Sequence, residues 1–410
     1  MTIPRAANSF DNTEIAANID EDIIDSLTGG RLVGSVTSFE NFAECPLRYY
    51  LRYGVDLKER EEFTFSPVNF GVVLHAVIRE VCDEIKKNGE SYYLISEEKR
   101  REMVKRSVAA ITDIYQNSIL KDSSRNSFMI KRMEDLADRT IWAMGEQLKC
   151  GDFVPFVFEH KFNMEVGDGD RKQLMSGTID RVDICENGTD VYVRIIDYKT
   201  GKKDFNIVKT YYGIDIQLMV YMEAAMKLVA KMRPGKNVIP AGVFYYNISD
   251  PIVSATTESA EEIEDKIKGE LRLKGMVNSD KDIAEKMDNT EGTSLNIPVS
   301  RKADGGFDSR RSKVMNTEQF NILGRFVDVR AIDTADRIVG GDIRRSPYKD
   351  GQFSSCDRCP YGAVCGFSVD LPGCNYRKLK KFDDEVLWNN IKEGVDENGK
   401  KMDTGAEERD

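Results

Sequence analysis

The stretch that decides the fold is GTIDRVDICENGTDVYVRIIDYKTG, residues 177–201. Its two halves are rich in apolar and β-branched residues, which is typical of strands, and the polar ENGTD between them predicts a tight turn. Asp180 and Asp197 each lie on or at the end of an apolar strand, where an ionised carboxylate is costly unless a cation pairs with it. The stretch therefore predicts a pair of strands that presents two carboxylates.

Lys199 adds a positive charge beside the second carboxylate. It follows Asp197 by two residues, and on a strand two side chains at that spacing leave the same face. Mg²⁺ prefers oxygen ligands, usually one or two carboxylates together with water and phosphate oxygens. An ammonium beside such a carboxylate can position or activate a water and offset the charge of a phosphoryl transition state. The pattern predicts metal-dependent cleavage of phosphodiester bonds.

The segments around this stretch predict an α/β core in the order helix, three strands, helix, strand. The expected elements, from hydrophobic periodicity, are a helix at about 69–87, strands at 156–166, 174–185 and 190–201, a helix at about 210–232 and a strand at 238–248. Two helices are expected within 97–149 and another near 317–338. The capping-box pattern TSFE, residues 37–40, predicts the start of a short helix that carries Cys45 before Pro46 disturbs it.

Three further side chains are candidates for the same site. His75 lies on the apolar face of the first helix, and Gln217 and Tyr221 share a face of the later helix because they are four residues apart. Glu159 is a weaker candidate for an extra carboxylate, and its neighbour His160 is assigned to packing because it belongs to an alternating aromatic run.

Each of these signals has a plainer explanation when taken alone. Asp180 could cap a turn, Asp197 and Lys199 could form an exposed ion pair, and His75 and Tyr221 could be ordinary core residues. The ordered set favours a metal-dependent site, because chance would have to supply every member in one plausible order.

Composition sets the broad class. The 410 residues are 40% hydrophobic and 31% charged, as in globular proteins, and no apolar run is long enough to span a bilayer. The N-terminus lacks the layout of a signal peptide, so we expect a cytoplasmic location. The net charge of −11 argues against polyanion binding by the whole surface, but basic runs such as 99–106 and 377–381 could contact phosphates locally.

The chain has eight cysteines, and without a secretory signal these favour metal ligands and buried thiols over disulfides. Cys356, Cys359 and Cys365 follow the spacing C-x2-C-x5-C, and a thiolate site usually needs a fourth ligand. Cys374 is near in sequence, but a remote cysteine is equally possible because loop-closure entropy costs only about 0.6 kcal/mol per doubling of loop length. The spacing alone does not distinguish Zn²⁺ from an iron-sulfur cluster.

Taken in order, these motifs resemble the PD-(D/E)xK nucleases of the RecB type, and among them the C-terminal nuclease domain of the B subunit of bacterial AddAB helicase-nucleases. The similarity runs from about Ser35 to Lys381. It is carried by the segments SVTSFENFAECPLRYYLRYGVDLKER, FGVVLHAVI, GTIDRVD, IIDYKTG, GIDIQLMVY, PAGVFYYNISDPIV, ELRLKGMV and CDRCPYGAVCGF. The resemblance implies a restriction-endonuclease-like mixed sheet with helical flanks.

The resemblance also implies roles for the residues that match. His75, Asp180 and Asp197 are expected to hold Mg²⁺ or Mn²⁺, Lys199 to be the catalytic lysine, and Gln217 and Tyr221 to form the helix motif beside the site. A [4Fe-4S] cluster is expected on one cysteine before the core and three after it, namely Cys45, Cys356, Cys359 and Cys365. Cys374, Cys82, Cys150 and Cys185 are left as buried or free thiols.

The implied activity is that of a DNA exonuclease that acts at ends during double-strand break repair by homologous recombination, with an AddA-like partner subunit. No G-x-x-x-x-G-K-[ST] loop occurs in the chain, so it is not expected to be an ATP-driven motor alone. We expect an excised domain, a truncated gene product or a free-standing nuclease of the Cas4 type, which shares the cysteine layout. The other open alternative is a noncatalytic scaffold that binds DNA ends.

The sequence suggests six regions. They are an N-terminal arm or linker (1–34), a helical region with His75 and the first cluster cysteine (35–150), the nuclease sheet core (151–250), an insertion or lid (251–316), a C-terminal helix with the three-cysteine segment (317–381) and an acidic tail (382–410).

Overall fold

The computed structural model describes residues 18–20, 22–24, 32–58, 67–114, 124–167, 173–254, 258–371 and 373–407. The strands are β1 (Val33–Ser35), β2 (Val154–Val166), β3 (Gln173–Asn187), β4 (Asp190–Lys199), β5 (Asn237–Asn247), β6 (Lys274–Asn278), β7 (Val314–Met315), β8 (Tyr348–Asp350), β9 (Phe353–Ser354) and β10 (Arg377–Lys378). The helices are α2 (Val36–Glu44), α3 (Pro46–Tyr49), the π-helix η1 (Tyr50–Gly54), α4 (Pro67–Lys87), α5 (Glu97–Ile114), α6 (Ser124–Lys149), α7 (Ile207–Tyr211), α8 (Gln217–Met232), α9 (Ala260–Glu270), α10 (Lys281–Met287), α11 (Thr317–Val339), α12 (Gly362–Cys365) and α13 (Asp384–Glu407).

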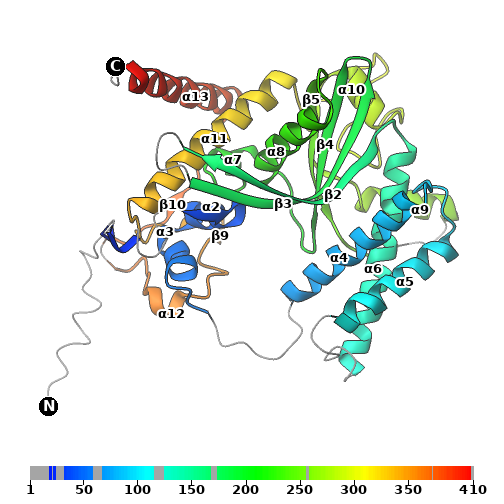
Figure 1. Ribbon diagram of the computed structural model, residues 1–410, viewed down its shortest axis with the longest axis horizontal. Coiled ribbons are helices and arrows are strands. Elements are labelled where there is room, and N and C mark those ends of the chain that lie inside the picture. Colours follow the sequence, from blue (N-terminus) through cyan, green and yellow to red (C-terminus); the bar gives the residue numbers. More distant parts are fainter. Residues whose placement is uncertain are drawn as a thin grey trace.

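A mixed seven-stranded sheet forms the centre of the molecule (Figure 1). Its order is β1-β3-β4-β5-β6-β7, and β2 pairs with β3. Strand β3 runs antiparallel to β2 and to β4, whereas β4 and β5 are parallel because α8 carries the chain back between them. The predicted order of helix, three strands, helix and strand is confirmed, and so is the mixed α/β class.

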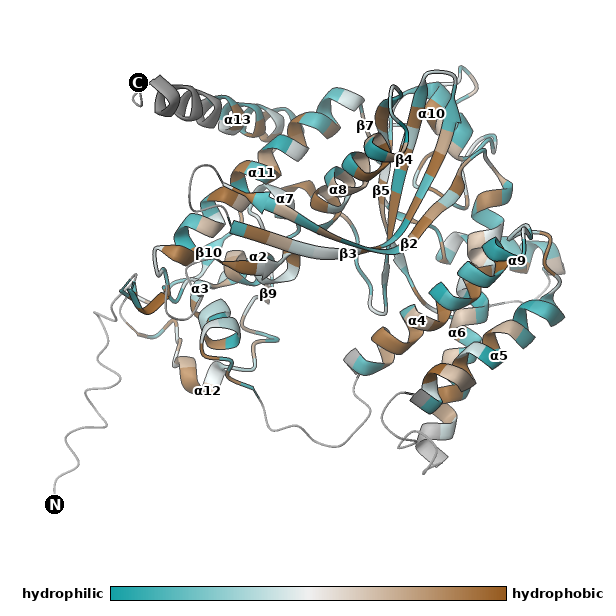
Figure 2. Ribbon diagram, viewed as in Figure 1, coloured by the Kyte–Doolittle hydropathy of each residue, from teal (hydrophilic) through white to brown (hydrophobic). Residues whose placement is uncertain are grey.

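Helices cover both faces of this sheet, each over its own apolar core (Figure 1). One core joins α2, α8, α11 and α13 to β2, β3 and β4, and the other joins α4, α5 and α6 to β4, β5 and β6. Figure 2 shows hydrophobic residues interspersed with hydrophilic ones along the strands, and the residues in the middle of β4 and β5 are buried on both faces of the sheet. Among the described residues, no helix is both long and apolar enough to cross a membrane.

The helix predicted at 210–232 is wrong in its first part. The chain forms the short α7, turns at Gly213, which has a φ of +76°, and begins α8 only at Gln217. A left-handed residue cannot continue a right-handed helix, and glycine takes that conformation without a steric cost. The break places Gln217 at the start of α8, where its backbone N–H has no partner within the helix.

The capping box predicted at 37–40 is also wrong. Helix α2 is capped by Ser35, whose hydroxyl accepts from the backbone N–H of Ser38. Glu40 instead reaches another helix. The helix ends at Glu44, and Pro46 starts α3 at a position where proline needs no N–H, so that Cys45 links two helices.

The segment 251–316, predicted as an insertion or lid, contributes two strands to the sheet. Strand β6 pairs antiparallel with β5, and β7 pairs parallel with β6. Charged residues on α9 and in the loops mask this pattern in the sequence, because β6 and β7 are too short for a clear alternation.

The two terminal regions also contribute to the fold. Within the predicted arm 1–34, most residues lie outside the described ranges, but Leu32 is buried and Val33 begins β1, which pairs with β3. Within the predicted acidic tail, α13 packs on α11 through the buried Leu387 and Ile391. The first part of the predicted tail is therefore a helix that packs against the rest of the fold.

A buried ion triad joins β3 to β4. Arg181 donates two hydrogen bonds to Asp183, at 2.7 and 2.6 Å, and Arg194 donates to the same carboxylate at 2.9 Å. All three side chains are at most 1% exposed. Burial opposes ionisation of Asp183, but the two guanidiniums hold its pKa below the ordinary value. Asp183 is therefore a structural residue, although it belongs to the same GTIDRVD motif as Asp180.

We expect Asp183→Ala to lower the free energy of unfolding by about 3–5 kcal/mol, because two buried guanidiniums would lose their counter-ion. Denaturant unfolding of the purified protein measures this. Asp152→Ala is the control, since Asp152 forms an exposed ion pair with Lys286 at 3.4 Å and should change stability by no more than about 1 kcal/mol. Equal losses in the two variants would contradict the structural role of the triad.

Candidate active site

Three carboxylates stand in a row across adjacent strands of the sheet. The register of the neighbouring pairs, when extended, places Glu159 across from Asp180 and Asp180 across from Asp197. The β2–β3 ladder skips the first of these pairs, and the β3–β4 ladder ends just before the second, at Arg181 and Ile196. Cβ atoms of directly opposed residues are about 4.5–5.5 Å apart, and like charges at that distance repel. A cation between these carboxylates would therefore be stabilising.

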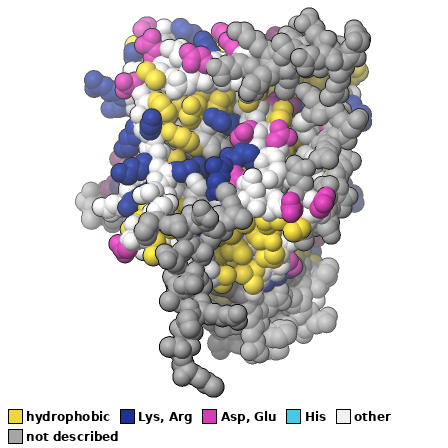
Figure 3. All heavy atoms as spheres, turned by 90° about the vertical axis from the view of Figure 1, so that its left-hand side faces the viewer, with side chains coloured by type: hydrophobic (Ala, Val, Ile, Leu, Met, Phe, Trp, Pro, Cys, Tyr) yellow, Lys and Arg dark blue, Asp and Glu magenta, His cyan; other side chains and the backbone are white. Residues whose placement is uncertain are grey.

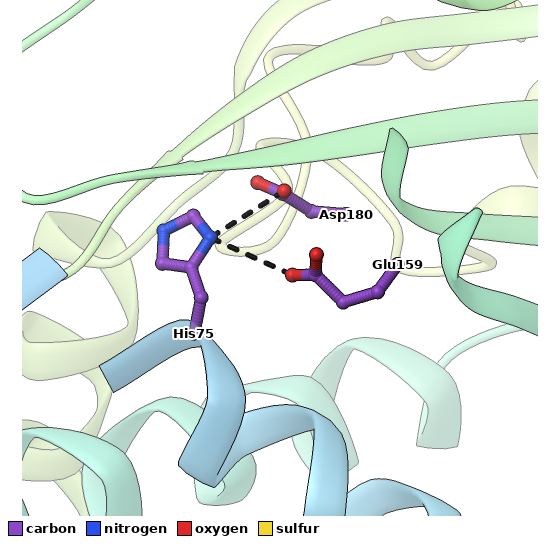
Figure 4. A group of neighbouring side chains, drawn as sticks. All are labelled: His75, Glu159 and Asp180. Carbon is purple, nitrogen blue, oxygen red and sulfur yellow. Dashed lines mark ion pairs between the residues drawn. The ribbon is translucent and has the colours of Figure 1, made fainter. Parts of the chain in front are cut away.

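Glu159 reaches this row through an unusual backbone. It has a φ of +48° in the middle of β2, a conformation that non-glycine residues rarely adopt. Such strain is retained where the surrounding structure imposes it, often at functional sites. Here it accompanies a carboxylate that points toward His75 (Figure 4).

His75 extends from α4 toward both carboxylates (Figure 4). Its Nδ1 lies 3.4 Å from Asp180 Oδ1 and 3.7 Å from Glu159 Oε1. One ligand atom from each of the three residues lies within 4.8 Å of the others, a spacing that can hold a metal ion. Burial lowers the pKa of His75, but Asp180 and Glu159 outweigh it and raise the pKa to about 10. The pocket thus attracts positive charge strongly.

Asp197 and Lys199 lie beside this group. Asp197 is 2% exposed, and Lys199 Nζ lies 2.5 Å from its Oδ2. That oxygen is buried and receives no hydrogen bond of good geometry from the described residues. Burial raises the pKa of Asp197 to about 7, and the negative charge of Asp180 adds to the effect. A second cation, in addition to the lysine ammonium, would therefore stabilise the ionised form of Asp197.

The predicted helix motif contacts the lysine directly. Lys199 Nζ donates to Gln217 Oε1 at 2.8 Å, and Gln217 Nε2 donates to the Tyr221 hydroxyl at 2.9 Å. Both residues are buried on α8, which packs on β3, β4 and β5. The amide therefore fixes the position of the ammonium.

No sequence pattern predicts the second ion pair beside the site. Lys203 Nζ lies 3.0 Å from Asp215 Oδ1, to which the Tyr245 hydroxyl donates at 2.6 Å. Lys199 and Lys203 both lie over the Tyr245 ring, at 5.5 and 4.6 Å from its centre. Tyr245 pairs with Asp197 in the β4–β5 ladder, which is why these groups meet. No local motif joins them in the sequence.

The four cysteines expected to form one site come together from opposite ends of the fold. All are free thiols, with Cys45 buried and Cys356, Cys359 and Cys365 partly exposed. Burial raises the pKa of Cys45, and the nearby Cys359 adds to this. Burial likewise raises the pKa values of Cys356 and Cys365, to which Cys45 and Cys359 contribute. The thiols are thus close enough to affect one another's charge.

Protein contacts hold the two cysteine segments together. Arg377 donates to the backbone carbonyls of Ala43 and Glu44 at the end of α2, where a cation is favoured. The Tyr361 hydroxyl donates to the Leu57 carbonyl at 3.0 Å. Cys374 is buried.

Basic side chains gather in the middle of the face shown in Figure 3, which is the left-hand side of Figure 1. That side includes α3, α12 and β10 (Figure 1). The segments that carry the cysteines have exposed basic residues, namely Arg52, Arg344, Lys349, Lys378 and Lys380. A local positive surface is therefore present despite the acidic net charge.

Acidic side chains and one lysine, set on the adjacent strands of a mixed sheet, define the nuclease class in which a D-x-K pair follows an upstream acid. The sequence from 34 to 366 matches the PD-(D/E)XK nuclease superfamily, and the chain belongs to it. The D-x-K sequence Asp197-Tyr198-Lys199 lies on β4 of this sheet.

The curated relatives are much longer proteins. The B subunit of the ATP-dependent helicase/deoxyribonuclease of Lachnoclostridium phytofermentans is 34% identical over 401 residues, which cover 95% of this chain and 34% of that protein. Proteins of the same name from Thermoanaerobacter sp. and Clostridium acetobutylicum are 33% and 34% identical, with 90% and 93% of this chain covered. The chain spans about a third of the length of these relatives.

Proposed function

We propose that this chain is the nuclease part of the B subunit of a helicase-nuclease and hydrolyses phosphodiester bonds at DNA ends. The observation that carries the proposal is the row of Glu159, Asp180 and Asp197 with His75 at one end and Lys199 at the other. The names of the relatives support deoxyribonuclease activity and a multi-subunit assembly. We propose an AddA-like helicase-nuclease as the partner and the cytoplasm as the location.

The residues fit a divalent cation, Mg²⁺ or Mn²⁺. His75, Asp180 and Asp197 would hold it, and Glu159 would act as a further ligand, directly or through water. When bound, such a cation polarises a phosphoryl oxygen and offsets negative charge in the transition state. With the cation bound, His75 would be neutral, because the ring nitrogen that binds the metal cannot also be protonated.

The protein groups around the cation have separable roles. Lys199 would orient the attacking water and stabilise charge on the phosphoryl oxygens, since its ammonium is already directed toward Asp197. Gln217 would hold the ammonium in place, and Tyr221 would orient the amide of Gln217. Lys203, which is 33% exposed, is available to a DNA phosphate near the same site.

We further propose that Cys45, Cys356, Cys359 and Cys365 hold a [4Fe-4S] cluster. All four are free thiols, and hydrogen bonds of Arg377 and Tyr361 join the segments that carry them. Four thiolates also suit Zn²⁺, and iron analysis with visible absorbance of anaerobically purified protein distinguishes the two.

Digestion of end-labelled linear DNA tests the proposed function. We expect digestion in the presence of Mg²⁺ or Mn²⁺ and no digestion after EDTA is added. Single- and double-stranded substrates, labelled at either end, show which strand form is degraded and from which end. Salt-sensitive binding without metal-dependent cleavage would instead favour a noncatalytic scaffold. Cleavage that stays unchanged when an AddA-like partner is added would favour a free-standing nuclease of the Cas4 type.

A further inference from the structure

The start of α8 lacks a cap of its own. Its N-cap residue is Ile216, which has no side-chain acceptor, although the first backbone N–H groups of a helix need one. Glu40 supplies it from α2, since its Oε1 accepts from the N–H of Ile216 at 2.9 Å and of Gln217 at 3.0 Å. A carboxylate at this place also interacts favourably with the helix dipole.

A short chain of contacts leads from this cap to the lysine. Glu40 holds the backbone of Gln217, and the side chain of Gln217 accepts from Lys199 Nζ at 2.8 Å. Lys199 in turn pairs with Asp197. Burial is the largest effect on Glu40 and raises its pKa to about 7, although the nearby Lys203 opposes the rise. The carboxylate therefore lies close to the charged groups of the site.

We propose that Glu40 is a positioning residue, which fixes the first turn of α8 and through Gln217 sets the place of the Lys199 ammonium. This inference rests on the proposed nuclease function. The hydrogen bonds of the Glu40 carboxylate go to the backbone of Ile216 and Gln217, so its effect on the position of the lysine passes through Gln217, in addition to a direct charge interaction with Lys199. A displacement of about 1 Å in a catalytic group can cost about 100-fold in rate.

The test compares single-turnover digestion of labelled linear DNA by the full chain and its variants at saturating Mg²⁺. We expect Glu40→Ala to lower the rate constant by about 10- to 100-fold with little change in the apparent affinity for DNA. Glu40→Gln should retain most of the rate, because its amide oxygen still accepts from both N–H groups. Glu44→Ala is the matched control on the same helix, since that carboxylate pairs with Arg48.

A double-mutant cycle separates positioning from general structure. If Glu40 acts through Gln217, then Glu40→Ala adds little to the loss caused by Gln217→Ala, whereas independent effects multiply. If Glu40→Ala does not fold, Glu40→Asp serves in the same cycle, because the shorter side chain cannot reach both N–H groups. Independent losses, or a Glu40 variant as fast as an active parent, would overturn the inference. An inactive parent would refute the proposed function itself.

Discussion

Asp197→Asn is expected to lower metal-dependent digestion of linear DNA by at least about 100-fold while leaving the protein folded. The carboxylate is buried beside Asp180, and burial with that negative charge raises its pKa to about 7. The amide removes a proposed metal ligand, and losing one electrostatic partner of a transition state typically costs about 10²- to 10³-fold in rate. The same change relieves repulsion within the row, so the free energy of unfolding should not fall.

The expected loss of activity without a loss of stability makes this prediction sharp. Denaturant unfolding and single-turnover digestion are measured on the same preparations, with iron content as a check on the cluster. Asp190→Asn is the control, because Asp190 lies at the far end of β4 and accepts from Asn237 at 3.0 Å. An Asp197 variant that digests DNA as fast as the parent would refute the proposed site.

Lys199→Ala should lose activity to a similar extent.

Cys45→Ala is expected to remove the iron and destabilise the whole protein. Cys45 is the only one of the four proposed ligands that precedes the sheet core, so its loss leaves α2 joined to the C-terminal segment by protein contacts alone, such as those of Arg377. Structural Zn²⁺ sites with thiolate ligands contribute roughly 10 kcal/mol of apparent binding free energy to folding. We expect loss of a cluster ligand to lower the unfolding midpoint strongly for the same reason. Cys374→Ala should keep both iron and stability close to those of the parent.

Iron analysis and visible absorbance of anaerobically purified protein measure the first effect, and denaturant unfolding measures the second. Equal iron content in the Cys45 variant and the parent protein would rule out Cys45 as a ligand. If the purified protein is colourless and contains zinc, the four thiols hold a zinc ion and not an iron-sulfur cluster.

The long strands and the D-x-K pair could be predicted because their signals are local. In β3 and β4 the apolar runs are long, and the turn between them has its own sequence pattern. The contact of Gln217 with Lys199 also follows from local spacing once α8 lies on the sheet. Their catalytic roles stay predictions until the variants are measured.

Other features depend on partners remote in sequence. Glu40 fits a local capping box, but tertiary packing gives its carboxylate to α8 instead. Glu159 is only a weak candidate from the sequence, because strand alternation does not reveal a left-handed residue that redirects a side chain. Lys203, Asp215 and Tyr245 meet only through the β4–β5 pairing and the start of α8. A single sequence carries no direct signal for such contacts.

The contact between Arg377 and the end of α2 has a consequence for synthesis of the protein. The arginine is 334 residues away from Ala43, whose carbonyl it binds. At about 5–20 residues per second, a ribosome needs roughly 20–70 s to make the intervening chain. During that time the α2 segment and the Cys45 thiol are present without their later partners. Nascent chains therefore pass through a stage in which this thiol is open to oxidation or to capture by a chaperone.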